Sequence, residues 1–282
     1  MMKTSSRFYR SSRIFIRHKS GMVGLAIVTV ILAVALLAPF IAPHDPFTMR
    51  PAHRFESPSW AFPFGTDEYG RCILSRILFA AILPFKIGAL SVLLGGAIGV
   101  STGLIAGYTG GVLDAVVMRF YDTLIAIPPL LMAIVVAVII GKSDMSLIIA
   151  LGISQTPIFA RLMRGETLRI KGKTYVEAAR AVGASDVHIL KSAIFPNAVA
   201  VLIVQATISF AALIILAAAL NFLGFGTPPP YPAWGKMLSV GRSYMAYSPW
   251  GILFPALSIV TLVLGTYLLG DGLRDALDPK RY

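Results

Sequence analysis

Two short strings in the sequence combine glycine, lysine and a hydroxyl residue, the combination that binds nucleotide phosphates. They are Gly-Lys-Ser at residues 141–143 and Gly-Lys-Thr at residues 172–174. A phosphate-binding loop needs a further glycine five residues before the second glycine of its motif. Val136 and Thr167 occupy those positions. Neither string follows a strand pattern, so we expect no nucleotide site and no ATP hydrolysis by this chain.

Other catalytic and metal-binding patterns are equally weak. The four histidines are dispersed and make no ligand cluster, and the single cysteine, Cys72, allows no intrachain disulfide. His44 and His53 lie in one polar segment that lacks the Gly-x-Ser-x-Gly turn of a serine hydrolase. We therefore expect no enzyme, no metal site and no cofactor bound by this chain itself.

Residues 174–197 form a polar and basic segment in a very apolar chain. Their pattern predicts two short helices joined at an elbow. Thr174, followed three residues later by Glu177, predicts a capping box at the start of the first helix. Gly183 is placed to end that helix in a left-handed conformation, which glycine adopts without a Cβ clash.

The second helix of the elbow has its own start and stop residues. Ser185 is expected to cap it, with Asp186 in its first turn, where a negative charge is favourable. Pro196 is expected to end it, because the proline ring blocks the preceding turn. A helical elbow favours a protein partner, and binding of anionic lipid heads is the alternative for so basic a segment.

The elbow also carries a family pattern: Glu177-Ala178-Ala179, then Gly183, then Pro196-Asn197. This spacing resembles the EAA loop of bacterial ABC-transporter permeases, which docks into the ATPase subunit. Three further segments are similar to permeases of dipeptide, oligopeptide and nickel importers. They are FGTDEYGRCILSR at 64–76, LNFLGFGTPPPYPAWGKML at 220–238 and LLGDGLRDALDP at 268–279. Cys72 stands where that family usually has aspartate, so no role of the aspartate is carried over.

The resemblance implies an all-α integral membrane protein with the type I ABC importer permease fold and a coupling loop at residues 164–197. It implies a homologous permease, two ABC ATPase subunits that hold ATP and Mg²⁺, and a periplasmic or surface solute-binding protein as partners. The implied cargo is a small peptide, or a chelated metal such as nickel, moved by alternating access. The implied ATPase-docking residues are Tyr175, Glu177, Ala178, Ala179, Arg180, Gly183, Ala184 and Ser185.

The composition independently predicts a membrane protein with several spans. Hydrophobic residues make up 56% of the chain and charged residues only 13%, whereas soluble domains carry about 25% charged residues. The net charge of +12 could suggest nucleic acid. The basic residues, however, lie in short runs beside apolar segments, as the positive-inside rule expects. We expect contact with membrane lipid and none with nucleic acid.

Six apolar runs predict the order of the membrane helices. Residues 1–20 are a basic cytoplasmic tail, interpreted either as an interfacial helix or as a disordered flank. Residues 21–43 are the first membrane helix, 44–80 an external loop and 81–282 a five-helix core. The core runs are 87–113, 123–141, 145–160, 199–225 and 251–270. Six spans in a bacterial inner membrane place both termini in the cytoplasm.

Special residues within the core suggest how its helices meet. Residues 114–122 are expected to form a charged inner turn in which Arg119 and Asp122 pair, and Pro128-Pro129 to kink the third span. Polar residues that could line a pathway are Gln155, Gln205 and Asn221. Glycines recur at every fourth residue of one run: Gly95, Gly99, Gly103 and Gly107. They predict a close contact with another helix, and a flexible gating face is the alternative.

Two functions of other classes stay open at this point. A secondary transporter would place ionisable groups inside its spans, and these spans are nearly free of them. A non-transport membrane scaffold would need no ATPase partner. Neighbouring genes that encode ATPases would distinguish the ABC permease from both alternatives.

Overall fold

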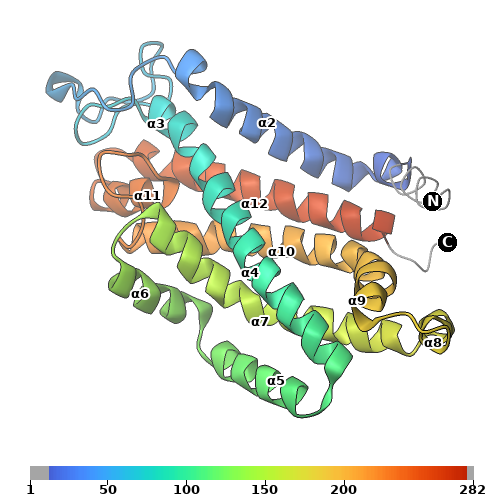
Figure 1. Ribbon diagram of the computed structural model, residues 1–282. Coiled ribbons are helices and arrows are strands. Elements are labelled where there is room, and N and C mark those ends of the chain that lie inside the picture. Colours follow the sequence, from blue (N-terminus) through green and yellow to red (C-terminus); the bar gives the residue numbers. More distant parts are fainter. Residues whose placement is uncertain (1–12, 278–282) are drawn as a thin grey trace.

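The computed structural model describes residues 13–277, which are helical apart from the connecting loops (Figure 1). The predicted all-α fold is confirmed. Residues 1–12 and 278–282 lie outside the described residues, so most of the predicted basic tail is not part of this description, although residues 13–17 form a helical turn.

The longer helices are α2 (Lys19–Ile41), α4 (Ile82–Thr109), α5 (Gly111–Ala126), α6 (Pro129–Ile140), α7 (Asp144–Lys171), α10 (Phe195–Phe222) and α12 (Trp250–Leu277). The shorter ones are α3 (Ile73–Ala80), α8 (Thr174–Ala181), α9 (Asp186–Ile189) and α11 (Trp234–Ser243), with a 3-10 turn at Pro51–His53 and a π turn at Leu190–Ile194.

Five helical stretches of the described chain are long and apolar enough to cross a membrane. Helices α5 and α6 together could form a sixth span, but they meet at 91° and so make a broken span or a re-entrant loop. Pro128 and Pro129 cause this break, because a proline lacks the N–H that would continue the helix. The expected kink is therefore a sharp corner. The five stretches are Lys19–Ile41, Ile73–Thr109, Asp144–Lys171, Asp186–Phe222 and Trp250–Leu277.

The charged stretch before this corner is helical, which corrects the predicted turn at residues 114–122. Those residues lie inside α5, and the chain turns earlier, at Gly110 and Gly111. Their φ angles are 72° and 61°, a backbone conformation that glycine adopts far more readily than other residues. Two adjacent glycines therefore decide where the chain leaves α4.

The helix that precedes α4 begins earlier than the sequence suggested. Residues 44–80 were assigned to an external loop, yet α3 begins at Ile73 and leads almost directly into α4. Ile73 and Ile77, one helical turn apart, are both buried in an apolar cluster with Trp234 and Leu262. This packing extends the helix beyond the uncharged run, so the loop ends at Cys72.

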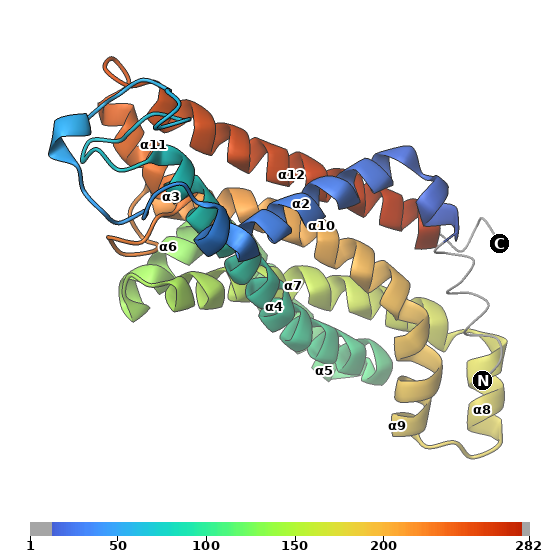
Figure 2. The ribbon, with the colours of Figure 1, turned by 90° about the horizontal axis from the view of Figure 1, so that it is seen from above.

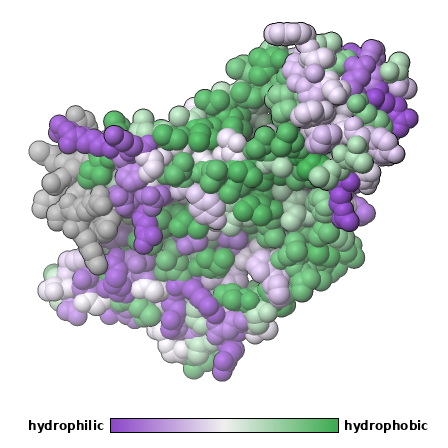
Figure 3. Space-filling model, turned by 180° about the vertical axis from the view of Figure 1, so that it is seen from behind, coloured by the Kyte–Doolittle hydropathy of each residue, from purple (hydrophilic) through white to green (hydrophobic). Residues whose placement is uncertain are grey.

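Helices α4 and α7 pack along each other at the centre of the molecule, with α10 and α12 beside them (Figures 1 and 2). Helix α2 lies on α12, and glycines bring the two backbones together. A Cβ atom on Gly24 would lie only 2.3 Å from the backbone nitrogen of Leu269. Viewed from behind, hydrophobic surface covers the middle of the molecule, and hydrophilic residues gather mainly toward its two ends (Figure 3). This distribution fits a protein that lies across a bilayer.

Candidate functional site

The predicted elbow consists of α8 and α9, which project from the end of α7 and lead back into α10 (Figure 2). Gly183, with a φ angle of 79°, ends α8. Its N–H donates to the Arg180 carbonyl at 2.9 Å, and the Ala184 N–H donates to the Ala179 carbonyl at 3.0 Å. These two bonds form a Schellman motif. The predicted helix stop at Gly183 is confirmed.

The start of α8 differs from the predicted capping box. Lys173, not Thr174, is the N-cap residue, and no side chain caps this helix. The Lys173 carbonyl accepts the N–H groups of Val176 at 2.8 Å and Glu177 at 3.2 Å. Because Thr174 is already helical, its hydroxyl is not placed to cap the Glu177 N–H. The predicted capping box is therefore wrong, and the Glu177 side chain is exposed.

The predicted stop at Pro196 is also wrong, because the helix continues through it. A π turn at Leu190–Ile194 precedes the proline, and the Phe195 N–H donates to the Leu190 carbonyl, five residues back. Such a turn changes which carbonyls are bonded. Pro196 then lies in the first turn of α10, where a missing N–H is tolerated. The elbow and α10 are thus joined without a loop.

The inner face of the elbow is anchored in an apolar cluster. Val176, Ile189 and Ile194 are fully buried there, beside Met163 and Ile170 of α7. Burial of one such side chain contributes about 1.5–3 kcal/mol. The elbow is therefore packed against α7 and α10 as part of the same body.

A polar contact also ties the elbow to the end of α4. Ser185 caps α9 by accepting the N–H three residues later at 3.4 Å, and Asp186 follows in the first turn, both as predicted. Asp186 accepts a hydrogen bond from the Tyr108 hydroxyl. The Arg180 guanidinium lies 5.2 Å from the centroid of the Tyr108 ring, and its hydrogen bond to Tyr108 raises the pKa of Arg180. Lys171 Nζ donates to the Tyr108 carbonyl at 2.5 Å.

The outer face of the elbow is exposed and partly apolar. Val182 is 84% exposed, Val187 59% and Tyr175 49%. Apolar side chains gathered on an otherwise polar surface are typical of a protein contact. Among the other predicted docking residues, Ala179 and Ala184 are half-buried against the apolar cluster, and the exposed ones are Glu177, Ala178, Arg180, Gly183 and Ser185.

The glycines of α4 lie where this helix meets α7. A Cβ atom on Gly95, Gly99 or Gly103 would come within 2.5, 2.4 or 2.2 Å of an α7 carbonyl oxygen. A Cβ atom on Gly107 would lie 3.0 Å from Thr167. The backbones of the two helices are thus too close for a side chain at the first three positions, and packing of this kind holds helices together in lipid.

The three polar residues predicted to line a pathway lie in different surroundings. Gln155 is buried in α7, and its Oε1 has no hydrogen-bond partner among the described residues. Gln205 donates to Ser209 of its own helix at 3.1 Å. Asn221 accepts the Thr227 N–H at 3.0 Å and closes the turn after α10. Gln205 and Asn221 lie about 24 Å apart along α10, and the pathway role of the three residues stays a prediction.

Two ion pairs, which the sequence did not predict, hold α5 against α7. Arg164 binds both carboxylate oxygens of Asp114 at 2.6 Å. Arg161 binds Asp122 at 2.5 Å, and this pair replaces the expected pair of Asp122 with Arg119. The sequence spacing favoured the local partner, whereas the fold brings α7 alongside.

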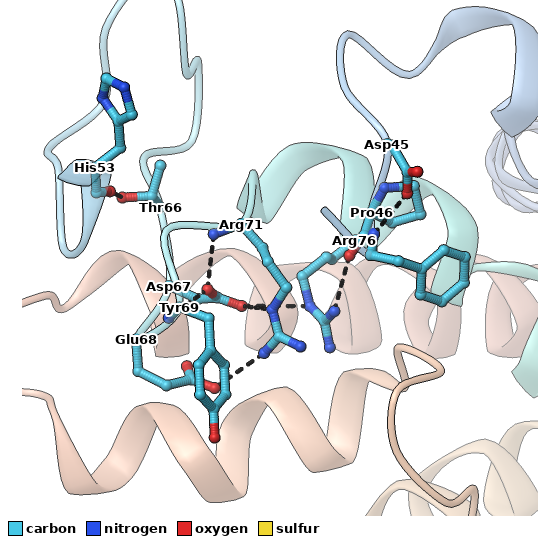
Figure 4. Close-up of polar contacts among 10 residues, drawn as sticks. Asp45, Pro46, His53, Thr66, Asp67, Glu68, Tyr69, Arg71 and Arg76 are labelled. Carbon is cyan, nitrogen blue, oxygen red and sulfur yellow. Dashed lines mark hydrogen bonds and ion pairs between the residues drawn. The ribbon is translucent and has the colours of Figure 1, made fainter. Parts of the chain in front are cut away.

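A cluster of charges that joins α3 to the loop before it was also missed, although its residues lie within the 64–76 motif. Asp67 accepts a hydrogen bond from Arg71 Nε at 2.7 Å and lies 3.5 Å from Arg76 Nε, and Glu68 accepts from Arg71 Nη2 at 3.0 Å (Figure 4). Arg76 donates to the Pro46 carbonyl at 3.0 Å. The four charged side chains, named here the loop charge cluster, are only 8–12% exposed. They tie the loop to α3.

Burial and neighbouring charges shift the pKa of two groups in this region, Glu68 of the cluster and His44 of the same loop. Burial and the adjacent Asp67 raise the pKa of Glu68. Burial and Arg50 lower the pKa of His44, whose ring stacks on another aromatic ring at 4.8 Å. Cys72 is fully buried at the N-cap position of α3 and makes no side-chain cap there.

Comparison with known proteins identifies the family. Residues 99–281 match the binding-protein-dependent transport system inner membrane component, and residues 6–58 match the N-terminal transmembrane domain of oligopeptide transport permease C. The chain belongs to this permease family. It is a multi-pass inner-membrane permease subunit of an ABC importer. Membership favours this function over a secondary transporter or a scaffold.

Individual relatives cover almost the whole chain. The dipeptide transport system permease protein DppC of Alkalihalophilus pseudofirmus is 41% identical over 94% of this chain and 87% of its own length. The glutathione transport system permease protein GsiD of Pectobacterium atrosepticum is 42% identical over 95% and 89%. A structure of the MetNI methionine ABC transporter matches 72% of this chain and 96% of its own with a TM-score of 0.60. Because the two sequences are only 21% identical, this similarity shows a shared fold and nothing about function.

Proposed function

We propose that this chain is the second permease subunit of an ATP-driven importer of small peptides. The two relatives are named for dipeptide and glutathione transport, and both cargoes are short peptides. Their names support the peptide cargo and lend no support to a chelated metal such as nickel. The partners in this proposal are a homologous permease, two ATPases that hold ATP and Mg²⁺, and an external solute-binding protein.

The observation that supports this proposal is the elbow itself. Its outer face is exposed and partly apolar, and its inner face is packed against α7 and α10. Val182 and Val187 enter a cleft of an ATPase subunit, and Glu177 faces basic groups of that subunit. ATP binding closes the ATPase pair and displaces the elbow. The buried residues on its inner face pass this displacement to α7 and α10, which yields alternating access.

The proposed orientation places the elbow and both termini in the cytoplasm. Basic residues concentrate around the elbow, which supports this side under the positive-inside rule. They are Arg161, Arg164, Arg169, Lys171, Lys173, Arg180 and Lys191. The loop charge cluster then lies on the external side, at the far end of the molecule (Figure 1).

Co-purification tests the docking surface. We would express the chain with its partner permease and the ATPases, as wild type and with Val182→Asp plus Val187→Asp. The control is Met245→Asp, since Met245 is also exposed (61%) but follows α11, which lies at the end of the molecule away from the elbow (Figure 1). We expect the double variant to lose the ATPases while it keeps the permease partner, and the control to keep both. Equal retention of the ATPases by all three proteins would refute the docking proposal.

Uptake by cells that lack the chromosomal copy of this permease tests the cargo. We expect the wild-type chain to restore uptake of a labelled dipeptide and to leave nickel uptake unchanged. Restored nickel uptake without dipeptide uptake would reverse the assignment of cargo.

A further inference from the structure

A hollow between the loop charge cluster and helices α11 and α12 forms a pocket at the external end. Its polar lining includes Glu68, Arg71, Arg76, Lys236, Tyr244 and Ser248. Phe55, Met237 and Val240 supply apolar surface. The hollow offers about 50 Å³ to groups of the size of water and is open to solvent on one side. It can therefore take a small charged group such as a carboxylate, while the rest of a ligand stays at its open side.

Each of the two arginines of the cluster has a guanidinium nitrogen that makes no hydrogen bond within the described residues. Arg71 uses Nε for Asp67 and Nη2 for Glu68, and Arg76 uses Nε for Asp67 and Nη1 for the Pro46 carbonyl. Within residues 13–277, no hydrogen bond leaves Arg71 Nη1 or Arg76 Nη2. Figure 4 shows the two guanidinium groups side by side, each with a nitrogen that no dashed line reaches. Both residues are 7% exposed and line the pocket. Neither free nitrogen is among the fully buried atoms without a partner, so a ligand or water in the pocket can reach them.

Two further groups in the pocket also lack a partner. Ser248 is 4% exposed, and its Oγ makes no hydrogen bond within the described part of the chain. Lys236, on α11, joins none of the ion pairs formed by residues 13–277. Lys236 is half-buried, whereas the Ser248 hydroxyl is fully buried, and a buried polar group without a partner is costly.

The charges of the lining do not balance. The guanidinium groups of Arg71 and Arg76 and the ammonium of Lys236 face the carboxylates of Asp67 and Glu68, which leaves one excess positive charge. Uncompensated charge in a partly buried site favours an ion of opposite sign. Planar guanidinium donors match the two oxygens of a carboxylate in particular.

We propose that this pocket binds the C-terminal carboxylate of a short peptide between Arg71, Arg76 and Lys236, with the Ser248 hydroxyl as a further donor. The assignment to a peptide rests on the proposed peptide cargo. The apolar residues of the lining receive the terminal side chain. Peptide released at the external face is thus held, by its charged end, at the entrance to the permease. An acidic side chain of an external protein would offer the same carboxylate chemistry.

Binding to the purified permease pair in detergent tests this site, with Ala-Ala and its C-terminal amide, Ala-Ala-NH₂, as probes. The variant is Lys236→Met, which leaves the loop charge cluster intact. Arg242→Met is the matched control, because Arg242 is an exposed cation on the same helix and does not line the pocket. We expect Ala-Ala to bind wild type and the control equally, and Lys236→Met at least tenfold more weakly. The amide should bind all three weakly.

Each of the following results with the first two probes would overturn the proposal: no binding of Ala-Ala to wild type, equal binding of Ala-Ala and its amide, or no effect of Lys236→Met. Failure here, with ATPases still retained by the elbow, would refute the pocket and leave the permease function standing. A third probe, Ala-Asp-NH₂, carries only a side-chain carboxylate. If it binds as tightly as Ala-Ala, the C-terminal assignment is wrong and an acidic side chain of a protein is the ligand.

Discussion

The hydroxyl of Tyr108, at the end of α4, donates a hydrogen bond to the carboxylate of Asp186, in the first turn of α9. This bond joins the central helix pair to the elbow across 78 positions of the sequence. Together with the Schellman motif at Gly183, it limits how far the elbow can move without α4. The relationship gives the first of four predictions.

Tyr108→Phe should loosen the elbow and leave the membrane helices intact. A hydrogen bond to a carboxylate that is partly open to solvent contributes about 1 kcal/mol, so we expect roughly fivefold faster hydrogen exchange of the α8 and α9 amides. Tyr267→Phe is the control, since the Tyr267 side chain is 44% exposed and makes no hydrogen bond within the described residues. Equal exchange in the wild type and Tyr108→Phe would show that the bond does not hold the elbow.

Gly183→Ala should open the elbow through backbone strain alone. No atom lies within 4 Å of an added Cβ, but the φ angle of 79° disfavours alanine by about 1–2 kcal/mol. Trypsin should then cleave after Arg180 about five times faster, or more. Gly172→Ala is the control, because Gly172 has equally open space and a φ angle of −85°. Cleavage of both variants at the wild-type rate would contradict the strained helix stop.

Gly103→Ala should destabilise the contact of α4 with α7. The added Cβ would lie 2.2 Å from the Ala160 carbonyl oxygen, which belongs to the α7 backbone and cannot turn away. Overpacking of this kind costs about 1–3 kcal/mol, so we expect a lower melting temperature in detergent. Gly96→Ala, whose Cβ would meet only Phe159 at 3.9 Å, should melt like wild type. A normal melting temperature for Gly103→Ala would mean that the two helices are not held this closely.

Arg76→Ala should open the loop before α3. Removal of one partner from a buried ion pair costs about 3–5 kcal/mol, because the remaining charge stays buried. Cys72 reports the opening, since it is the single cysteine of the chain and is fully buried. A thiol-reactive dye should label the variant at a lower temperature than wild type, while Arg242→Ala should label like wild type. Ready labelling of wild type at room temperature would contradict the burial of Cys72.

The elbow shows which structural features can be predicted from the residues next to them in the sequence and which cannot. The helix stop at Gly183 and the cap at Ser185 follow from chemistry within a few residues, and both are present. The predicted capping box at Thr174 is absent because the helix begins one residue earlier, with Lys173 as the N-cap residue. Local sequence preferences do not distinguish starting points that differ by one residue. Pro196 failed as a stop because a π turn precedes it and it falls in the first turn of α10, where its missing N–H is tolerated.

The sequence by itself determined the membrane class, the apolar runs and the elbow, because these depend on composition and on spacing along one helix. Only the tertiary structure decided which partners meet across the fold. Asp122 pairs with Arg161 rather than Arg119. Arg71 and Arg76 gather over Asp67, and Tyr108 reaches Asp186. Such contacts join distant residues, and their geometry is set by how whole helices pack, which no local pattern encodes.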